Sequence, residues 1–218
     1  MLELFAHPFS SYSQKVLIAL WADETPFTYR MLDDQHPDNV EILKQHSPFA
    51  LFPLLIDDGE PIFESTTIIE HLAACHPGPY RWIPDGAAGR RARFLDRFFD
   101  LHVMNNMQDI VFDALRPANA HDPFGVAKAR ANLTTAYRWL DELLGDGPWA
   151  VGNEFTLADC AAAPALFYAD WVEKIGTRHP RLAAYRARLL DHPIVARAVD
   201  EGRPYRNLFP IPGVSNRD

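Results

Sequence analysis

Residues 52–65 read Phe52-Pro53-Leu54-Leu55-Ile56-Asp57-Asp58-Gly59-Glu60-Pro61-Ile62-Phe63-Glu64-Ser65, and this stretch says most about the fold. Two short apolar runs flank Asp58-Gly59, a pair that suits the positive φ angles of a tight hairpin turn. Proline is tolerated at the first residue of a strand, and serine is a common N-cap of a helix. The stretch therefore predicts an antiparallel hairpin that Pro53 opens and that a helix follows from Ser65.

Upstream of this hairpin, the sequence alternates between strand and helix patterns. The predicted strands cover residues 2–5 and 27–32, and the predicted helices cover 12–21, 38–45 and, after the hairpin, 65–74. The order is therefore β-α-β-α-β-β-α. Because a helix separates the first two strands, we expect them to be parallel and joined by a right-handed crossover. Together these elements predict a small mixed sheet with helices on both faces.

Downstream of the hairpin, the pattern becomes purely helical. Residues 76–79 read His-Pro-Gly-Pro and end the predicted helix, and residues 84–86 read Pro-Asp-Gly and interrupt the chain again. Helical patterns then cover residues 88–115, 124–145, 156–173, 180–190 and, in a short segment, 194–201. We therefore expect an α/β domain over residues 1–76, a linker over 77–88, and an all-α helical bundle domain over 89–218.

The composition is that of an ordinary globular protein, with 48% hydrophobic and 23% charged residues and a formal net charge of −8. An acidic chain without a clustered basic face is not expected to bind nucleic acid. The sequence contains no run of about 20 apolar residues, so we expect no membrane span. The two cysteines, Cys75 and Cys160, are too few for a disulfide framework and fit a reducing compartment such as the cytoplasm.

One pair of metal-binding residue types stands out in the sequence. His71 and Cys75 lie four residues apart and could share one face of a helix. A metal site needs three or four ligands, and no further ligand cluster lies nearby along the chain. The sequence therefore predicts no metal site.

The loop after the first strand carries Ser10-Ser11-Tyr12-Ser13. Backbone N–H groups point out of a helix start, and the helix dipole favours negative charge there. A hydroxyl at this position could donate a hydrogen bond to a bound thiolate, or the serines could simply cap the helix. Because the slot contains no cysteine, dithiol redox chemistry by the chain itself is not expected.

Two further pairs, Phe52-Pro53 and Glu64-Ser65, could contact a ligand. A cis bond before Pro53 would turn the Phe52 backbone toward an extended ligand, although trans is the statistical default for an X-Pro bond. Ser65 at a helix start can bind a carboxylate, and Glu64 can accept a hydrogen bond from an ammonium group. An α-amino acid head presents both groups, whereas a plain helix cap would need only the serine.

Taken together, these features resemble the cytosolic glutathione S-transferases, in particular their serine-type classes such as zeta and delta. The resemblance rests on the serine-bearing loop with residues 13–16 (Ser-Gln-Lys-Val), on residues 52–55, on Glu64-Ser65 followed by Ile68, and on residues 155–159 (Phe-Thr-Leu-Ala-Asp). In the last of these, Thr156 and Asp159 have the spacing of a capping box. In this order, the motifs span most of the chain. The resemblance implies a thioredoxin-like domain followed by a helical domain.

The resemblance also implies roles for individual residues, with glutathione as the co-substrate. Ser10 occupies the position of the hydroxyl that stabilises the glutathione thiolate, and its neighbours Ser11, Tyr12 and Ser13 remain alternatives. Phe52, the residue before the family's cis-proline at Pro53, would bind the cysteinyl backbone. Glu64 and Ser65 match the pair that binds the γ-glutamyl head, and Lys44 matches a lysine that some members place on the glycyl carboxylate.

The chain departs from the family pattern at Leu51, where many relatives carry a polar residue that contacts glutathione. Phe49 matches an aromatic that some classes insert into a partner subunit, so the resemblance implies a homodimer, although a buried loop aromatic is equally compatible. A second-substrate pocket for a hydrophobic electrophile could include Met104, Met107, Gln108, Phe112 and Phe167, although apolar residues at helical spacing are more often core.

The function that the resemblance implies is detoxifying transfer of the glutathione thiol to a small hydrophobic electrophile. Two alternatives stay open. A glutathione-dependent disulfide or peroxide reductase, or an isomerase, would use the same thiol and need no cysteine of the chain. A non-catalytic binding module with the same fold would recruit partners without chemistry, because fold alone does not determine function.

Overall fold

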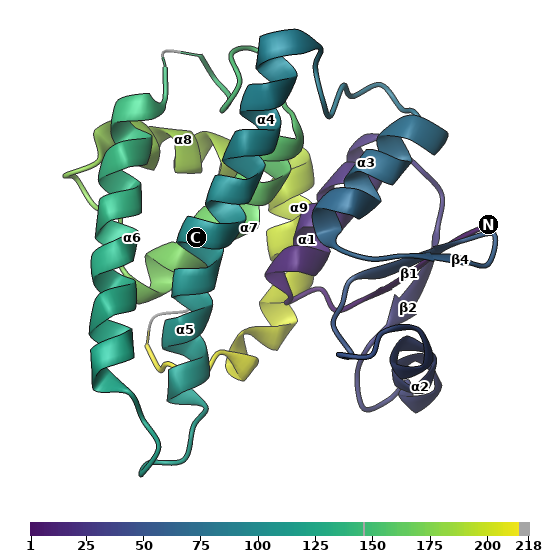
Figure 1. Cartoon of the computed structure of the whole chain (residues 1–218), viewed down its shortest axis with the longest axis horizontal. Helices are drawn as coiled ribbons and strands as arrows, with labels where there is room; N and C mark the ends of the chain where they lie inside the picture. The colour runs from purple at the N-terminus through teal and green to yellow at the C-terminus, as the bar shows by residue number, and fades with distance from the viewer. Residues whose placement is uncertain (146, 214–218) are drawn as a thin grey trace.

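The computed structural model describes residues 1–145 and 147–213 (Figure 1). The last five residues of the helical domain expected over 89–218 lie outside this described part. The N-terminal half contains, in order, β1 (Leu2–Ala6), α1 (Ser11–Ala22), β2 (Thr28–Met31), α2 (Pro37–His46), β3 (Leu54–Asp57), β4 (Glu60–Ile62) and α3 (Ser65–Cys75). This is the β-α-β-α-β-β-α order that the sequence predicts.

The four strands form one mixed sheet in the order β2-β1-β3-β4. β1 pairs with β2 in parallel, and β3 pairs with β1 and with β4 in antiparallel register. The predicted parallel pair and the predicted hairpin are thus both confirmed. The turn of the hairpin is Asp58-Gly59, and both residues have positive φ angles of 46° and 90°, as a tight primed turn requires.

Alternation along the strands divides the side chains between two cores. Leu4 and Leu55 face α1 and α3 and belong to the main core, which continues into the helical half of the chain. Phe5, Leu54 and Ile56 face the other way and form a smaller core beneath α2. Figure 1 shows α1 and α3 on one side of the sheet and α2 on the other. The period-two pattern of a strand therefore gives the sheet two buried faces.

The second half of the chain is helical within the described residues. It contains α4 (Gly86–Phe98), a π-helix (Phe99–Met104), α5 (Asn105–Ala114), α6 (Pro123–Leu143), α7 (Leu157–Val172), α8 (Pro180–Asp191), α9 (Pro193–Gly202) and a 3₁₀ helix (Arg203–Leu208). The continuous helix predicted over 88–115 is instead interrupted by the π-helix. The other helical predictions agree with the structure to within three residues at each end.

Helix α7 is the centre of the molecule. Every one of its residues is buried, and it packs against α1 of the N-terminal domain and against α4 and the π-helix. A helix that is apolar on all sides is expected to be fully enclosed. The segment between α3 and α4 is held to both halves, because the Trp82 indole donates to Asp23 (2.6 Å) and the Trp82 carbonyl accepts from the Leu157 N–H (2.9 Å). The two domains therefore share one core.

Candidate functional site

A cleft of about 1140 Å³ lies between the N-terminal domain and the helices that follow it. Its walls come from the start of α1, the loop between α2 and β3, the start of α3, and the α4 to α5 region. The lining residues are Ser10, Tyr12, His46, Ser47, Pro48, Phe49, Leu51, Phe52, Pro53, Phe63, Glu64, Ser65, Thr66, Thr67, Glu70, Arg97, Asp100, Leu101, Asn105, Gln108 and Phe112. The serine-bearing loop, the Phe52-Pro53 pair and the Glu64-Ser65 pair thus border the same cleft.

Ser10 is the N-cap of α1 and lines the cleft. Its hydroxyl oxygen accepts a hydrogen bond from the Ser13 N–H (3.3 Å). Its own N–H donates to the His7 carbonyl (3.0 Å), and the His7 Nδ1 accepts from the Phe9 N–H (3.1 Å). These bonds hold the loop, but they use the Ser10 hydroxyl only as an acceptor. Its hydrogen can therefore be donated to a group in the cleft.

Tyr12 also lines the cleft, whereas the other two candidate hydroxyls do not. The Tyr12 hydroxyl lies 3.4 Å from Asn105 Oδ1, and burial raises the pKa of Tyr12 above its ordinary value. The tyrosine therefore remains protonated at neutral pH. Ser11 and Ser13 are buried, and the Ser13 hydroxyl accepts from the His7 N–H (3.3 Å). The structure brings Ser10 and Tyr12 to the cleft and turns Ser11 and Ser13 away from it.

Phe52 and Pro53 form the edge of the cleft before β3, and the peptide bond between them is cis. Within the described residues, no hydrogen bond engages the Phe52 backbone. Its N–H and C=O groups are therefore available to an extended ligand that lies along this edge. Leu51, the neighbouring residue, is largely exposed on the same wall.

Glu64 and Ser65 form the start of α3 and also line the cleft. Glu64 is the N-cap and has a φ of 65°, a conformation that is uncommon for a residue with a long side chain and often marks a functional position. Ser65 is buried at the first turn, where backbone N–H groups have no partner within the helix. The pair presents a carboxylate beside a set of N–H donors, which suits an ammonium and a carboxylate on one ligand.

Asp100 reaches the cleft from the π-helix and belongs to none of the motifs visible in the sequence. One of its oxygens accepts from Lys15 Nζ (2.7 Å). Burial raises the pKa of Asp100, and the charges of Asp96 and Glu64 add to this effect while Lys15 opposes it. Leu101 lines the cleft from the same π-helix. π-helical turns frequently occur at functional sites, but no local sequence pattern predicted this one.

Two family models match the chain. The model described as the glutathione S-transferase N-terminal domain matches residues 4–80, and the model described as the glutathione S-transferase C-terminal domain matches residues 104–188. The two matches cover most of the chain and follow one another as the two halves of the fold do.

This chain belongs to the glutathione S-transferase family.

Its relatives include proteins of differing function. The chain is 26% identical to a probable maleylacetoacetate isomerase of Caenorhabditis elegans, over 94% of this chain and 96% of the relative. It is 25% identical to glutathione S-transferase GstB of Escherichia coli strain K12, over 91% and 98%. A solved glutathione S-transferase of Methylobacterium radiotolerans, in complex with glutathione sulfonate, is 27% identical and matches with a TM-score of 0.78 over 90% of this chain and 93% of that one.

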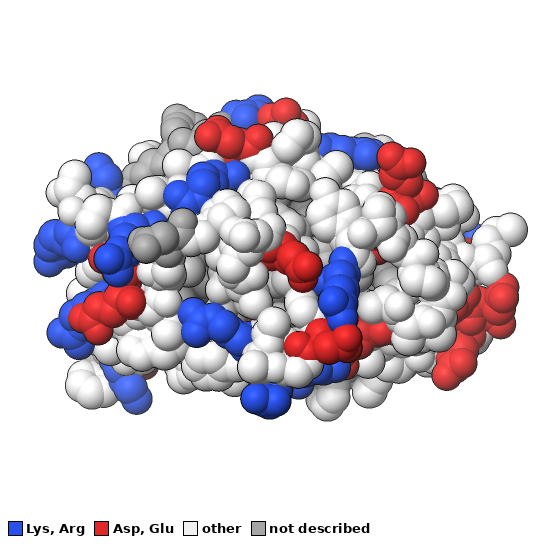
Figure 2. Space-filling model, turned by 90° about the horizontal axis from the view of Figure 1, so that it is seen from above, with Lys and Arg blue, Asp and Glu red and all other residues white. Residues whose placement is uncertain are grey.

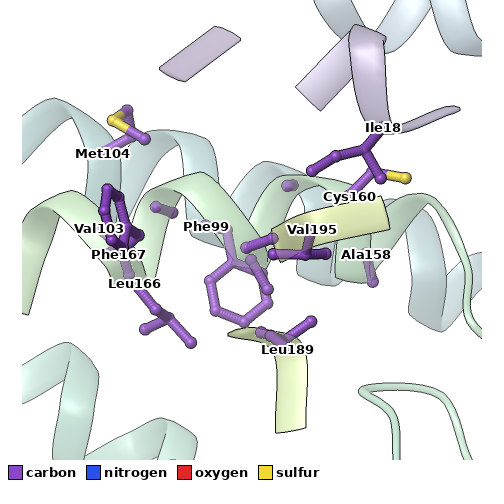
Figure 3. Close-up of a cluster of buried hydrophobic side chains, with 14 of the residues drawn as sticks. Ile18, Phe99, Val103, Met104, Ala158, Cys160, Leu166, Phe167, Leu189 and Val195 are labelled. Carbon is purple, nitrogen blue, oxygen red and sulfur yellow. The ribbon is translucent and has the colours of Figure 1, made fainter. Parts of the chain in front are cut away.

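Several of the predicted site residues of this glutathione S-transferase family member lie outside the cleft. Lys44 is exposed on α2, with its Nζ 4.0 Å from Glu41, and does not line the cleft. Met104, Met107 and Phe167 are buried in the main core, and Figure 3 shows Met104 and Phe167 among other apolar side chains of that core. Gln108 and Phe112 do line the cleft. Side chains on one helix divide between core and cleft because they point in different directions.

The face of this family member that Figure 2 shows carries charges of both signs. Figure 2 shows lysine and arginine interspersed with aspartate and glutamate on one face of the molecule. Interspersed charges create no extended field of one sign. Among the described helices, none is long and apolar enough to cross a membrane.

Proposed function

We propose that this protein conjugates the thiol of glutathione to a small hydrophobic electrophile. The observation that carries the proposal is the state of Ser10, whose oxygen is already hydrogen-bonded at a helix start while its hydrogen is available in the cleft. A hydroxyl that accepts one hydrogen bond is polarised and donates a second one more strongly. The glutathione thiolate is the acceptor that this donor would stabilise.

In this proposal, the domain of residues 1–76 binds glutathione, and the helical domain from residue 89 covers the electrophile. The Phe52 backbone pairs with the cysteinyl residue, which directs the sulfur toward Ser10. The γ-glutamyl carboxylate lies on Ser65 and the first N–H groups of α3. Its ammonium group lies beside Glu64, which lines the cleft together with Asp100. Opposite charges at the two ends of one amino-acid head determine its orientation.

The catalytic effect would come from populating the thiolate and holding the electrophile beside it. Lowering a thiol pKa by about two units requires roughly 2.7 kcal/mol of preferential stabilisation of the anion. One charge-assisted hydrogen bond from Ser10 and the N-terminus of α1 can together supply this amount. The thiolate then attacks the electrophilic carbon, a C–S bond forms, and the leaving group departs or a proton is taken up. No covalent bond to the enzyme is needed.

We assign the electrophile to the apolar wall of the cleft opposite the sulfur. Phe112 and Leu101 come from the helical domain and are both more than half exposed, and Gln108 is the polar residue beside them. Apolar side chains exposed in a concave surface commonly mark a ligand pocket. Met104, Met107 and Phe167 have no place in this assignment because they belong to the core.

We also propose that the protein is a cytoplasmic homodimer. Phe49 is 80% exposed and lines the cleft. Phe94 is also exposed and belongs to an aromatic group with Phe98 and Trp139. Large exposed apolar side chains on a folded chain indicate an interaction surface. Both cysteines are free thiols, which fits a reducing compartment. Light scattering of the wild type and of Phe49→Ser tests the dimer.

Two other functions use the same cleft. A glutathione-dependent isomerase or reductase is supported by the similarity to the probable isomerase of C. elegans, because an isomerase needs the same bound thiolate. A non-catalytic module is supported by the exposed Leu51 beside Phe52, because an apolar side chain there gives glutathione no hydrogen bond.

The test combines a binding measurement with a pH profile. Calorimetry is expected to show one glutathione per chain. Absence of binding at millimolar glutathione contradicts both enzymatic functions.

In conjugation of a chloronitrobenzene, Ser10→Ala is expected to raise the pH midpoint of kcat/KM by about one to two units. Tyr12→Phe, the matched control, is expected to leave the midpoint unchanged. An unchanged midpoint in Ser10→Ala removes Ser10 from the mechanism. Turnover of a disulfide or a cis alkene without conjugation indicates the reductase or isomerase.

A further inference from the structure

Three metal-binding side chains converge on the N-terminal domain, away from the cleft. Asp57 Oδ2 lies 2.9 Å from His71 Nε2 and 2.6 Å from His76 Nε2. One donor atom of each residue lies within 4.8 Å of the donor atoms of the other two. Spacing along the sequence suggested only His71 and Cys75 as a pair. In the structure, Cys75 is not part of this cluster. His71 is joined instead by Asp57 and His76.

The backbone determines where all three side chains lie. Asp57 is the last residue of β3 and is paired with Leu2 of β1. His71 is on the last turns of α3, and His76 is the C-cap, where its N–H donates to the Leu72 carbonyl (2.8 Å). The ends of a central strand and of a packed helix are rigid elements. The cluster is therefore largely formed before any ligand binds, which lowers the entropic cost of binding.

The surroundings favour a positive charge at this place. The C-terminus of a helix carries the negative end of the helix dipole, and the cluster lies at the C-terminus of α3. Both imidazole Nε2 atoms approach the same carboxylate oxygen. A divalent cation between them would be bound by two nitrogens and one oxygen, and its charge would offset that of the carboxylate.

We propose that Asp57, His71 and His76 bind one divalent transition-metal ion, with Zn²⁺ as the reference metal. Two imidazoles and a carboxylate are a common set of three protein ligands for Zn²⁺, with water in the fourth position. Tetrahedral bonds of about 2.0–2.2 Å separate ligand atoms by about 3.4 Å. The observed separations of 2.6 and 2.9 Å are shorter. A small rotation of the Asp57 side chain therefore makes room for the ion.

The exposure of the three side chains determines what kind of site this is. Their side chains are 14%, 22% and 34% exposed for Asp57, His71 and His76. An ion can therefore enter and leave, unlike one in a closed structural site. Helix α3 has 11 residues and is about 16 Å long, and Glu64 and Ser65 lie at its other end. The ion would join the end of β3 to the end of α3 and stabilise the domain without touching the cleft.

The test uses the full chain without a histidine tag, freed of metal by a chelator. Calorimetric titration with Zn²⁺ near neutral pH is expected to show one saturable site per chain. His71→Gln and His76→Gln are each expected to weaken this site by about tenfold or more. His36→Gln is the matched control, because His36 Nδ1 lies 2.6 Å from Asp33 Oδ1 on the same domain but without a second histidine. This variant is expected to bind Zn²⁺ as the wild type does.

Two further readouts separate binding from misfolding. Zn²⁺ is expected to raise the Tm of the wild type and of His36→Gln but not that of His71→Gln/His76→Gln, whose far-ultraviolet circular dichroism checks the fold. Co²⁺ in the same site is expected to give the visible absorption of a four-coordinate ion. The proposal is wrong if the wild type shows no saturable Zn²⁺ binding, or if His76→Gln binds Zn²⁺ with unchanged affinity. Neither result bears on glutathione binding, which is measured separately.

Discussion

Lys15 Nζ lies 2.6 Å from Asp96 Oδ1, and the two side chains are 1% and 0% exposed. Lys15 is on α1 of the N-terminal domain and Asp96 is on α4 of the helical domain. The same ammonium group contacts Asp100 (2.7 Å) and the Thr66 hydroxyl (2.9 Å), and Thr66 in turn donates to Asp96 (2.8 Å). One buried network thus connects the domain interface to the wall of the cleft.

Removing the cation from this network should destabilise the whole chain. Lys15→Met keeps much of the side-chain volume but removes the buried ammonium group that Asp96 and Asp100 share. Breaking a buried ion pair at one partner costs about 3–5 kcal/mol, and urea unfolding is expected to show a loss of this size. Lys44→Met is the control. Its exposed Nζ is 4.0 Å from Glu41, so its loss should stay below about 1 kcal/mol. Equal losses in the two variants would contradict the assigned role of burial.

Neutralising Glu64 should weaken glutathione binding rather than the chemical step. In the proposed pose, the Glu64 carboxylate accepts from the ammonium of the γ-glutamyl head. Loss of a hydrogen bond to a charged group corresponds to a rise of about tenfold to a hundredfold in the KM for glutathione, with kcat little changed. Steady-state kinetics of Glu64→Gln measure both constants.

Glu70→Gln is the matched control for Glu64→Gln. Glu70 also lines the cleft, but its carboxylate accepts from Arg93 Nε (2.9 Å). Its neutralisation is expected to change the KM for glutathione by less than about threefold. If the KM for glutathione rises more in Glu70→Gln than in Glu64→Gln, the ammonium group binds Glu70 and the proposed pose is wrong.

His7 should make the stability of the chain depend on pH just below neutrality. Burial lowers the pKa of His7, and its Nδ1 accepts from the Phe9 N–H in the loop that carries Ser10. A histidine with a lowered folded pKa contributes stability above its ordinary pKa of about 6.5, and this contribution is lost as the pH falls toward the folded value. Urea midpoints between about pH 7.5 and pH 5 are expected to fall more steeply for the wild type than for His7→Asn. Parallel profiles would contradict the assignment.

Asp159 should be far more important for stability than an exposed helix cap. Its buried carboxylate accepts from the Ala150 N–H (2.9 Å), the Thr156 N–H (2.9 Å) and hydroxyl (3.2 Å), and the Tyr185 hydroxyl (2.7 Å). Asp159→Ala leaves buried donors unpaired, and we expect a loss of about 3 kcal/mol or more in the free energy of unfolding.

Asp122→Ala provides the comparison for Asp159→Ala. Asp122 caps α6 at an exposed position, where its side chain accepts from the Gly125 N–H (2.9 Å). Loss of an exposed N-cap costs about 1 kcal/mol. Chemical denaturation of both variants measures the difference. Similar losses at the two positions would show that burial adds little to the Thr156–Asp159 capping box.

Much of the fold could be predicted from local sequence. The Asp58-Gly59 turn, the alternation in the flanking strands and the helical periodicities specify each element through interactions within a few residues. The Thr156–Asp159 capping box, whose spacing is visible in the sequence, is present at the start of α7. The interruption at Phe99–Met104 was not visible, because a single short π-helical segment with i→i+5 hydrogen bonds changes the apolar periodicity of a long helical pattern too little to be recognised.

The candidate site was only partly predictable. The sequence by itself determined that a serine-bearing helix start, a Phe52-Pro53 edge and the Glu64-Ser65 helix start exist, because each is a short motif with its own backbone geometry. Tertiary structure decided which residues face the cleft, since the rotation of each helix depends on what it packs against. It placed Ser10 and Tyr12 there, buried Met104 and Phe167, and brought Asp57 to His71 and His76. Contacts between distant segments follow from packing, which no local pattern encodes.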